Sequence, residues 1–265
     1  MKYKFLKNLG IYLSLIAGIL TATSCEKEFA EPTIDNTPVA YVAVHNFALL
    51  AGATSSVFVN NTQLKIADIN VALGVGGSLL GNYIGVTPGA AIVGLRTATG
   101  TTDFASRTIN VAKTTYTSFF AFDTLTTGGT ARILALNNDM RAPDTAVSNI
   151  RFLHLSPNAG PVNVVLTRTL NQFGLAATGT VNLTNIPYVG ATATPNEAAL
   201  SVFSGAPAGI YTVVVTSGTT TLLTVPNVNL RERKNYSIVL RGFAPPRAAI
   251  PAGQTLGLSL LLHNP

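Results

Sequence analysis

Short runs in which apolar and polar residues alternate dominate the chain from Val39 onward. In residues 211–216, Tyr211, Val213 and Val215 face one way, and the residues between them face the other way. Alternation of this kind, rich in Val, Ile, Thr, Tyr and Phe, predicts β-strands. The same pattern occurs at 56–59, 133–136, 162–166 and 236–240, and turn residues separate the runs at Gly100, Gly128, Gly129, Gly160, Gly209, Gly218 and Gly253. Because no segment shows a sustained helical period with caps, we expect an all-β chain.

The runs recur in the same order in the two halves of the chain. Residues 42–46 and 57–59 parallel 152–156 and 162–164, and His45 of the first copy stands for the motif histidine His154 of the second. Residues 99–102 and 115–117 parallel 217–220 and 235–237, and 133–138 parallels 258–264. Each copy has on the order of a hundred residues, a common domain size. We therefore predict two tandem Ig-like β-sandwich domains, at 39–141 and 150–265, joined by a linker at 142–149.

The first 25 residues have the pattern of an export signal. Three lysines precede an almost entirely apolar run at 9–20, and the small residues of 22–24 precede Cys25, the single cysteine. The run is too short for a membrane-spanning helix, and ordinary secretion would leave Cys25 as a lone thiol in an oxidising compartment. The arrangement resembles a bacterial lipoprotein signal, and residues 26–28 resemble either a Bacteroidetes surface-export tag or a solvated tether. We expect a signal peptide at 1–24, lipidation of Cys25 and a tether at 25–38. The protein would then be anchored to the outer membrane of the cell envelope, at its periplasmic face or at the cell surface.

Composition restricts the partners. Hydrophobic residues make up 47% of the chain and charged residues 11%, so the chain is not of the disordered kind. The formal net charge is +6, but without Lys2, Lys4 and Lys7 of the leader 14 basic residues remain against 11 acidic ones. The densest basic cluster, at 231–234, contains Glu232. Nucleic-acid binding therefore has little electrostatic support, and no nucleic-acid partner is expected.

One motif in the second copy resembles a known family. Residues 150–164 read Ile-Arg-Phe-Leu-His-Leu-Ser-Pro-Asn-Ala-Gly-Pro-Val-Asn-Val. This stretch resembles the opening of the domain-of-unknown-function family 4397, whose members typically show Arg-Phe-x-His-x-Ser-Pro-Asp-Ala-Pro-x-Val-Asp-Val. Residues 208–213, 224–230 and 236–242 resemble later strands of the family. Asn158 and Asn163 stand where the family usually has aspartates. The resemblance is strong in the second copy and weak in the first, and it implies an envelope module of open activity.

The motif also holds the strongest candidate for catalysis. His154 and Ser156 lie two residues apart on a predicted strand, so their side chains can point the same way, as a hydrolase needs for a base and a nucleophile. No acid of the expected kind lies nearby, and no Gly-x-Ser-x-Gly elbow is present. We favour a structural reading in which His154 holds the loop through a backbone hydrogen bond and Ser156, Pro157 and Asn158 form a turn.

Metal, phosphate and glycan sites have weaker support. The histidines are His45, His154 and His263, without metal-ligand spacing, so no metal or other cofactor is expected. The glycine-rich segment 74–81 lacks the Lys-Ser/Thr ending of a P-loop, which favours a hairpin or surface loop. Trp is absent, and three aromatic residues near loops are either a glycan platform or packing groups: Tyr83, Tyr188 and Phe203.

Two tripeptides resemble the Asp-Thr-aliphatic acceptor for O-glycosylation of secreted Bacteroidetes proteins. They make Thr124 and Thr145 possible acceptor sites. Taken together, the sequence favours a lipid-anchored envelope protein that is not an enzyme and acts as a structural, binding or adhesion module. Its partners would be the membrane, through the lipid, and envelope proteins or glycans. The alternatives are a glycan-binding module or a hydrolase that uses His154 and Ser156.

Overall fold

The computed structural model describes residues 39–49, 54–66, 69–70, 72–74, 77–78, 83–97, 100–125, 131–245, 250 and 253–264. The predicted leader, Cys25, the tether up to residue 38, the glycines at 128–129 and most of the glycine-rich segment 74–81 lie outside these residues. Within the described part, no helix is both long enough and apolar enough to cross a membrane.

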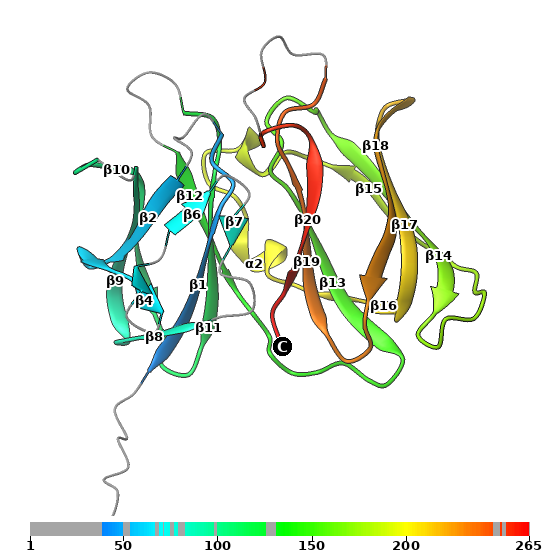
Figure 1. Cartoon of the computed structure of the whole chain (residues 1–265), viewed down its shortest axis with the longest axis horizontal. Coiled ribbons are helices and arrows are strands. Elements are labelled where there is room, and N and C mark those ends of the chain that lie inside the picture. The colour runs from blue at the N-terminus through cyan, green and yellow to red at the C-terminus, as the bar shows by residue number, and fades with distance from the viewer. Residues whose placement is uncertain are drawn as a thin grey trace, which may run out of the picture. The chain divides into compact units, whose positions relative to one another are not determined.

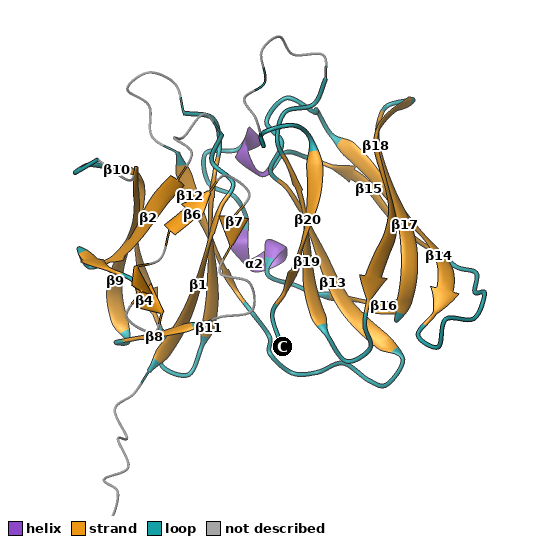
Figure 2. Cartoon of the chain, viewed as in Figure 1, coloured by secondary structure: helices purple, strands orange, loops and turns teal. Residues whose placement is uncertain are grey.

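The first half of the chain forms a sandwich of two sheets (Figures 1 and 2). One sheet consists of β1 (Ala40–Asn46), β7 (Gly77–Ser78), β8 (Ile84–Val86), β11 (Tyr116–Phe122) and β12 (Arg132–Asn137). The other consists of β2 (Thr54–Val59), β3 (Thr62–Gln63), β6 (Ala72–Gly74), β9 (Gly89–Thr97) and β10 (Asp103–Val111). A separate pair is formed by β4 (Lys65–Ile66) and β5 (Ile69–Asn70).

The second half forms another two-sheet sandwich. Its sheets consist of β13 (Val147–His154), β16 (Ser204–Pro207), β19 (Asn235–Arg241) and β20 (Gly257–Leu262), and of β14 (Val162–Asn171), β15 (Thr180–Ile186), β17 (Gly209–Ser217) and β18 (Thr220–Leu230). The 3-10 helix η1 (Val189–Ala191) and the single-turn helix α2 (Glu197–Leu200) lie between β15 and β16. The prediction of an all-β chain built from sandwich domains is confirmed.

The two sandwiches share one strand order. The sheet order β12-β11-β1, with β8 on the far side of β1, matches β20-β19-β13-β16. The order β10-β9-β2-β3 matches β18-β17-β14-β15. In both sandwiches the first strand pairs in parallel with the seventh of these eight matched strands, β1 with β11 and β13 with β19. Corresponding strands also follow one another in the same order along the chain.

Alternation along the strands builds a separate apolar core inside each sandwich. In β17, Tyr211, Val213 and Val215 are at most 1% exposed, whereas the residues between them are half-buried. In the first sandwich, Val93 of β9 and Phe119 of β11 are buried in the same way. Each such side chain contributes about 1.5–3 kcal/mol to folding, which explains why the two-residue period was readable in the sequence.

A third apolar cluster lies between the sandwiches. Phe120 and Leu134 of the first sandwich pack with Leu153, Val239 and Leu261 of the second. These side chains point out of their own sandwich. The sheet that contains β11 and β12 therefore packs against the sheet that contains β13, β19 and β20. Residues 38–265 accordingly form one compact unit.

Backbone hydrogen bonds fix which residues of β1 and β13 correspond. The N–H of Phe47 donates to the carbonyl of Ala121 on β11 at 2.8 Å. In the second sandwich, the N–H of Leu155 donates to the carbonyl of Leu240 on β19, also at 2.8 Å. Phe47 therefore corresponds to Leu155.

The same correspondence corrects the sequence alignment of the histidines. Asn46 corresponds to His154, and each side chain accepts the backbone N–H two residues further on, at 3.1 and 3.3 Å. His45 corresponds to Leu153. The pairing of His45 with His154 was wrong by one residue, and in a strand one residue reverses the face of the side chain.

Candidate functional site between the two sandwiches

The motif loop (residues 154–160) is held by the ring of His154. Its Nε2 lies 2.7 Å from the carbonyl oxygen of Gly160, and its Nδ1 lies 3.3 Å from the N–H of Ser156. Since a carbonyl only accepts and a backbone N–H only donates, Nε2 carries the proton and the ring is neutral. Burial lowers the pKa of His154 and favours this neutral form. This is the backbone hydrogen bond expected for His154.

The other motif residues are also engaged in loop structure. Asn158 accepts the N–H of Ala244 through Oδ1 and donates to the carbonyl of Ala244 through Nδ2, both at 2.8 Å. Pro157 is half-buried next to it. Ser156 contacts His154 through its backbone N–H, and its Oγ is buried without a hydrogen-bond partner. The loop therefore fastens the end of β13 to the end of β19, and the serine hydroxyl is not bonded to the imidazole.

A buried polar cluster lies where the sandwiches meet. We call it the interface polar cluster, and it consists of His45, Tyr83, Ser118, Asn138, Arg151, Ser237 and His263. Its centre is Arg151 of β13, which is 5% exposed. Arg151 donates from Nε to Ser237 Oγ at 2.6 Å and from Nη2 to Asn138 Oδ1 at 2.7 Å. The bond to Asn138 joins β13 of the second sandwich to the segment that follows β12 of the first.

Equivalent positions of the two sandwiches supply the polar partners. Asn138 follows β12 and donates to Ser118 Oγ at 2.9 Å, and His263 follows β20 and contacts Ser237 Oγ at 2.7 Å. Ser237 Oγ already accepts from the guanidinium, so its hydroxyl hydrogen can be donated to Nε2 of His263. Nδ1 of His263 then carries a proton and lies 2.9 Å from the hydroxyl of Tyr83. Both sandwiches thus contribute to one hydrogen-bond network.

Burial controls the ionisation of this cluster. Desolvation, followed by repulsion from Arg151, lowers the pKa of His45 to about 3. Desolvation, Arg151 and then His45 lower the pKa of His263 well below its usual value. Desolvation raises the pKa of Tyr83 to about 12 and lowers that of Arg151 to about 9, so the guanidinium still carries its charge at neutral pH.

Three donor or acceptor atoms of the cluster have no partner. They are Nη1 of Arg151 and the two ring nitrogens of His45, all buried. Arg151 lies within the family motif but was not among the predicted site residues. The signal was present, because Arg151 is the one charged residue of the apolar run 150–155 and lies between the inward-facing Ile150 and Phe152.

A second set of contacts between the sandwiches surrounds Arg132 of β12. Its guanidinium donates to Asp123 at 2.8 Å and to the carbonyls of Gly190 and Thr192, each at 2.7 Å. The hydroxyl of Tyr188 donates to Asp123 at 3.0 Å. The β15–β16 connection is thereby tied to the first sandwich.

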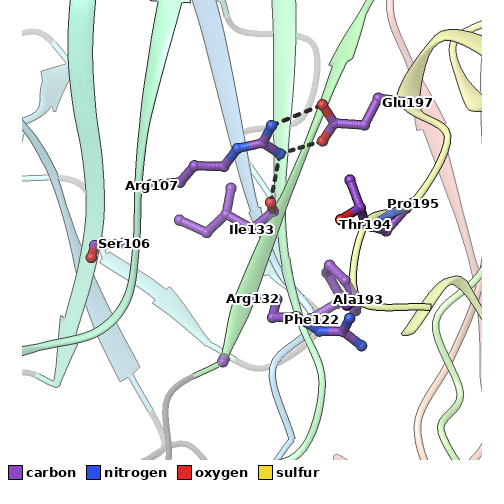
Figure 3. A pocket seen from close by; sticks show the side chains of 10 residues that line it. Ser106, Arg107, Phe122, Arg132, Ile133, Ala193, Thr194, Pro195 and Glu197 are labelled. Carbon is purple, nitrogen blue, oxygen red and sulfur yellow. Dashed lines mark hydrogen bonds and ion pairs between the residues drawn. The ribbon is translucent and has the colours of Figure 1, made fainter. Parts of the chain in front are cut away.

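A cleft of about 340 Å³ opens beside this contact (Figure 3). At one side, Arg107 of β10 makes a two-bond ion pair with Glu197 of α2, and it also donates to the carbonyl of Ile133 at 3.0 Å. Glu197 further accepts the N–H of Ala135 at 2.7 Å. The hydroxyl-bearing residues Ser106, from β10, and Thr194, from the β15–β16 connection, line the same cleft. The cleft is polar, and its charged groups already join the two sandwiches.

The three aromatic residues considered for a glycan platform are packing groups. The Tyr83 hydroxyl belongs to the interface polar cluster, and Tyr188 packs against the apolar cluster between the sandwiches. The Phe203 ring lies under the guanidinium of Arg151 at 4.7 Å. They do not form a shared exposed surface.

The remaining sequence candidates lie apart. Thr145 is exposed in the turn before β13, whereas Thr124 is half-buried and its N–H bonds to Asp123 at 3.0 Å. His45 is close enough to His263 to contribute to the lowering of its pKa, while His154 is engaged in its own loop. The described residues contain no group of three or more His, Cys, Asp or Glu side chains that could hold a metal ion.

Comparison with solved structures shows distant similarities. The chain has 11% identity to a proposed cell adhesion protein from Bacteroides ovatus, covering 86% of this chain and 97% of that one, with a TM-score of 0.24. It has 12% identity to a leucine-rich repeat protein from Bacteroides thetaiotaomicron, covering 79% of this chain and 26% of that one, with a TM-score of 0.21. The TIE protein of Bacillus anthracis is 12% identical, with 86% and 44% covered and a TM-score of 0.20.

No curated protein matches the chain. A family model does match, over residues 40–165. The match includes the first sandwich and, in the second, β13, the motif loop and the first residues of β14. The comparison therefore supports the family described as Domain of unknown function (DUF4397), the family that the motif at 150–164 resembles.

Proposed function

We propose that this chain is a lipid-anchored envelope protein whose two sandwiches form one rigid, non-catalytic binding or adhesion module. The observation that carries the proposal is the state of His154 and Ser156. Both ring nitrogens of His154 bond to the backbone, and the Ser156 hydroxyl is buried without a hydrogen-bond partner. A general base must reach the proton that it removes, and this imidazole is committed to holding a loop.

The contacts between the sandwiches support a rigid module. Apolar packing, the Arg107–Glu197 pair, the bonds of Arg132 and the bond from Arg151 to Asn138 all join them. Arg107, Glu197 and Arg132 would be candidates for catalysis in an open cleft, but here they bond one sandwich to the other. We further propose that the sandwiches are two copies of one domain, which is supported by their matching strand order.

The anchor is proposed from the sequence around Cys25. Metabolic labelling with palmitate should mark the full chain, and Cys25→Ala should abolish the label. Labelling that persists in Cys25→Ala contradicts the anchor without affecting the proposed binding role. Protease treatment of intact cells then separates a surface position from a periplasmic one.

The non-catalytic role is tested with two variants of the motif loop. His154→Asn places in the second sandwich the residue that the first sandwich uses at Asn46, and Ser156→Ala removes the hydroxyl. Binding of the chain to isolated envelope fractions should be the same for wild type and both variants. A panel of ester and peptide substrates should remain unhydrolysed by all three proteins. Hydrolysis by the wild type that both variants lose would overturn the proposal in favour of a hydrolase.

Glycan binding is a second candidate, favoured by the polar cleft of Figure 3. Its volume is within the range of small-molecule sites, and it offers two arginines, a carboxylate and two hydroxyl-bearing residues. A glycan array should then show selective binding that Thr194→Trp, which fills the cleft, reduces at least tenfold. Thr145→Trp, on an exposed turn away from the cleft, is the control. Equal binding by wild type and Thr194→Trp would remove the cleft from consideration.

A further inference from the structure

The interface polar cluster contains a buried positive charge without a counter-charge. Arg151 is 5% exposed, and its partners Ser237, Asn138 and His263 carry no negative charge. No carboxylate of the described residues pairs with it. The rings of Phe203 and Phe120, at 4.7 and 5.8 Å, offer cation–π attraction, which is weaker than an ion pair. A buried charge is normally paired, because transfer from water to the protein interior is costly.

Unsatisfied donors lie on two residues that approach the ring of Phe120. Nη1 of Arg151 is buried without a partner, although its two N–H groups are strong, charge-bearing donors. The ring of His45 stacks on Phe120 at 4.7 Å, and neither of its nitrogens has a partner. A neutral imidazole still carries one N–H donor. The ring of Phe120 therefore has the guanidinium of Arg151 and the imidazole of His45 near it, and each of these groups has an N–H without an acceptor.

From this geometry we propose that a small monovalent anion of the halide class, with chloride as the physiological example, binds between the two sandwiches as the counter-ion of Arg151. Nη1 of Arg151 is its principal donor, and the N–H of His45 is the second donor of the site. Water could accept the same hydrogen bonds, but it would leave the guanidinium charge uncompensated. A larger carboxylate or phosphate ligand does not suit the site, because the unpartnered atoms, Nη1 of Arg151 and the ring nitrogens of His45, are buried. The anion would thus be a structural ligand that joins the sandwiches.

The test measures thermal unfolding of the full chain in detergent. Sodium chloride replaces sodium gluconate at constant ionic strength and constant pH 7.5, so that general screening is unchanged. A ligand that binds only the folded state raises the melting temperature with the logarithm of its free concentration. We expect a rise of about 3–5 °C for each tenfold increase in chloride above its dissociation constant. Bromide should act similarly.

Two variants assign the effect to the site. Arg151→Met should abolish the chloride dependence, because the charge that recruits the anion is gone. Arg241→Met is the matched control, since Arg241 lies on the same sheet as Arg151 but bonds to Ser259 and Gly253. It should keep the full dependence. Equal melting temperatures of the wild type in chloride and gluconate would overturn the proposal and leave water as the occupant.

A direct measurement covers the case in which Arg151→Met fails to fold. Crystals of the full chain grown in bromide should show an anomalous peak within hydrogen-bond distance of Nη1 of Arg151. Bromide found only at the protein surface, with nothing beside Arg151, would also contradict the site. Chloride dependence that persists in a folded Arg151→Met would contradict the assignment to this residue.

Discussion

Acidification should loosen the interface between the sandwiches through His45. The ring is 3% exposed, stacks on Phe120 and has the charge of Arg151 nearby. Burial, and then the positive charge of Arg151, disfavour the imidazolium. Together they lower the pKa of His45 to about 3 from an unfolded value of about 6.5. The unfolded chain therefore binds a proton at pH 5 that the folded chain does not bind. Stability contributed by the neutral ring is complete above pH 6.5 and is lost as the pH falls below that value.

The pKa difference determines the size of this effect. Each pH unit below the unfolded pKa of His45 costs about 1.4 kcal/mol, until the folded pKa is reached. Between pH 7.5 and pH 5, His45 alone should therefore lower the free energy of unfolding by about 2 kcal/mol. The pKa of His263 is lowered in the same direction, so the wild type should lose more than this amount in total.

Urea unfolding at pH 7.5 and pH 5 measures the loss, in sodium gluconate without chloride so that no halide occupies the proposed anion site. His45→Leu is the informative variant, because Leu153 occupies the corresponding position of the other sandwich. It should remove about 2 kcal/mol of the acid-induced loss and change stability little at pH 7.5.

Leu153→Ala is the control for a general weakening of the interface. It should lower the free energy of unfolding by about 2–5 kcal/mol at both pH values alike. If His45→Leu loses as much stability between pH 7.5 and pH 5 as the wild type does, His45 is not the group that titrates, and the electrostatic account of the interface is wrong.

Two further predictions concern an ion pair at the interface and two glycines with positive φ. Glu197→Gln removes the charge that pairs with Arg107 and should lower the free energy of unfolding in urea by about 1–2 kcal/mol. Arg141→Ala breaks an ion pair that is exposed to solvent and should leave the urea midpoint unchanged. Equal effects of the two variants would refute a role for Glu197 at the interface. Gly242 has a φ of 86°, and an added Cβ would lie 2.2 Å from a backbone carbonyl oxygen, so Gly242→Ala should cost at least about 3 kcal/mol. Gly218 has a φ of 55° and open space around it, so Gly218→Ala should lower the free energy of unfolding by only about 1 kcal/mol. A lower melting temperature for Gly218→Ala than for Gly242→Ala would contradict this reasoning.

The strands and the two cores could be predicted from the sequence because they depend on neighbouring residues. A period of two along 211–216 requires only that one face be buried, and the buried set Tyr211, Val213 and Val215 follows directly. His154 belongs to this local class as well. Its backbone partners, Ser156 and Gly160, lie within six residues along the chain.

The alignment of the two halves of the chain depends on more than neighbouring residues. His45 and His154 share a residue type, and the sequence comparison paired them for that reason. Parallel pairing with β11 and β19 places them one residue apart, so they face opposite ways. Similarity between short segments cannot distinguish two alignments that differ by one residue. In a pleated strand, that one-residue offset decides whether a side chain enters the interface.

The amino-acid sequence alone determined the all-β architecture, the two cores and the motif loop, because each follows from the order of residues a few positions apart. Only the tertiary structure decided what Arg151 does. Its partners Asn138 and His263 lie 13 and 112 residues away, and they meet it only after both sandwiches have formed and packed face to face. Burial in that interface, which no local pattern encodes, turns an ordinary arginine into a desolvated charge in need of a counter-ion.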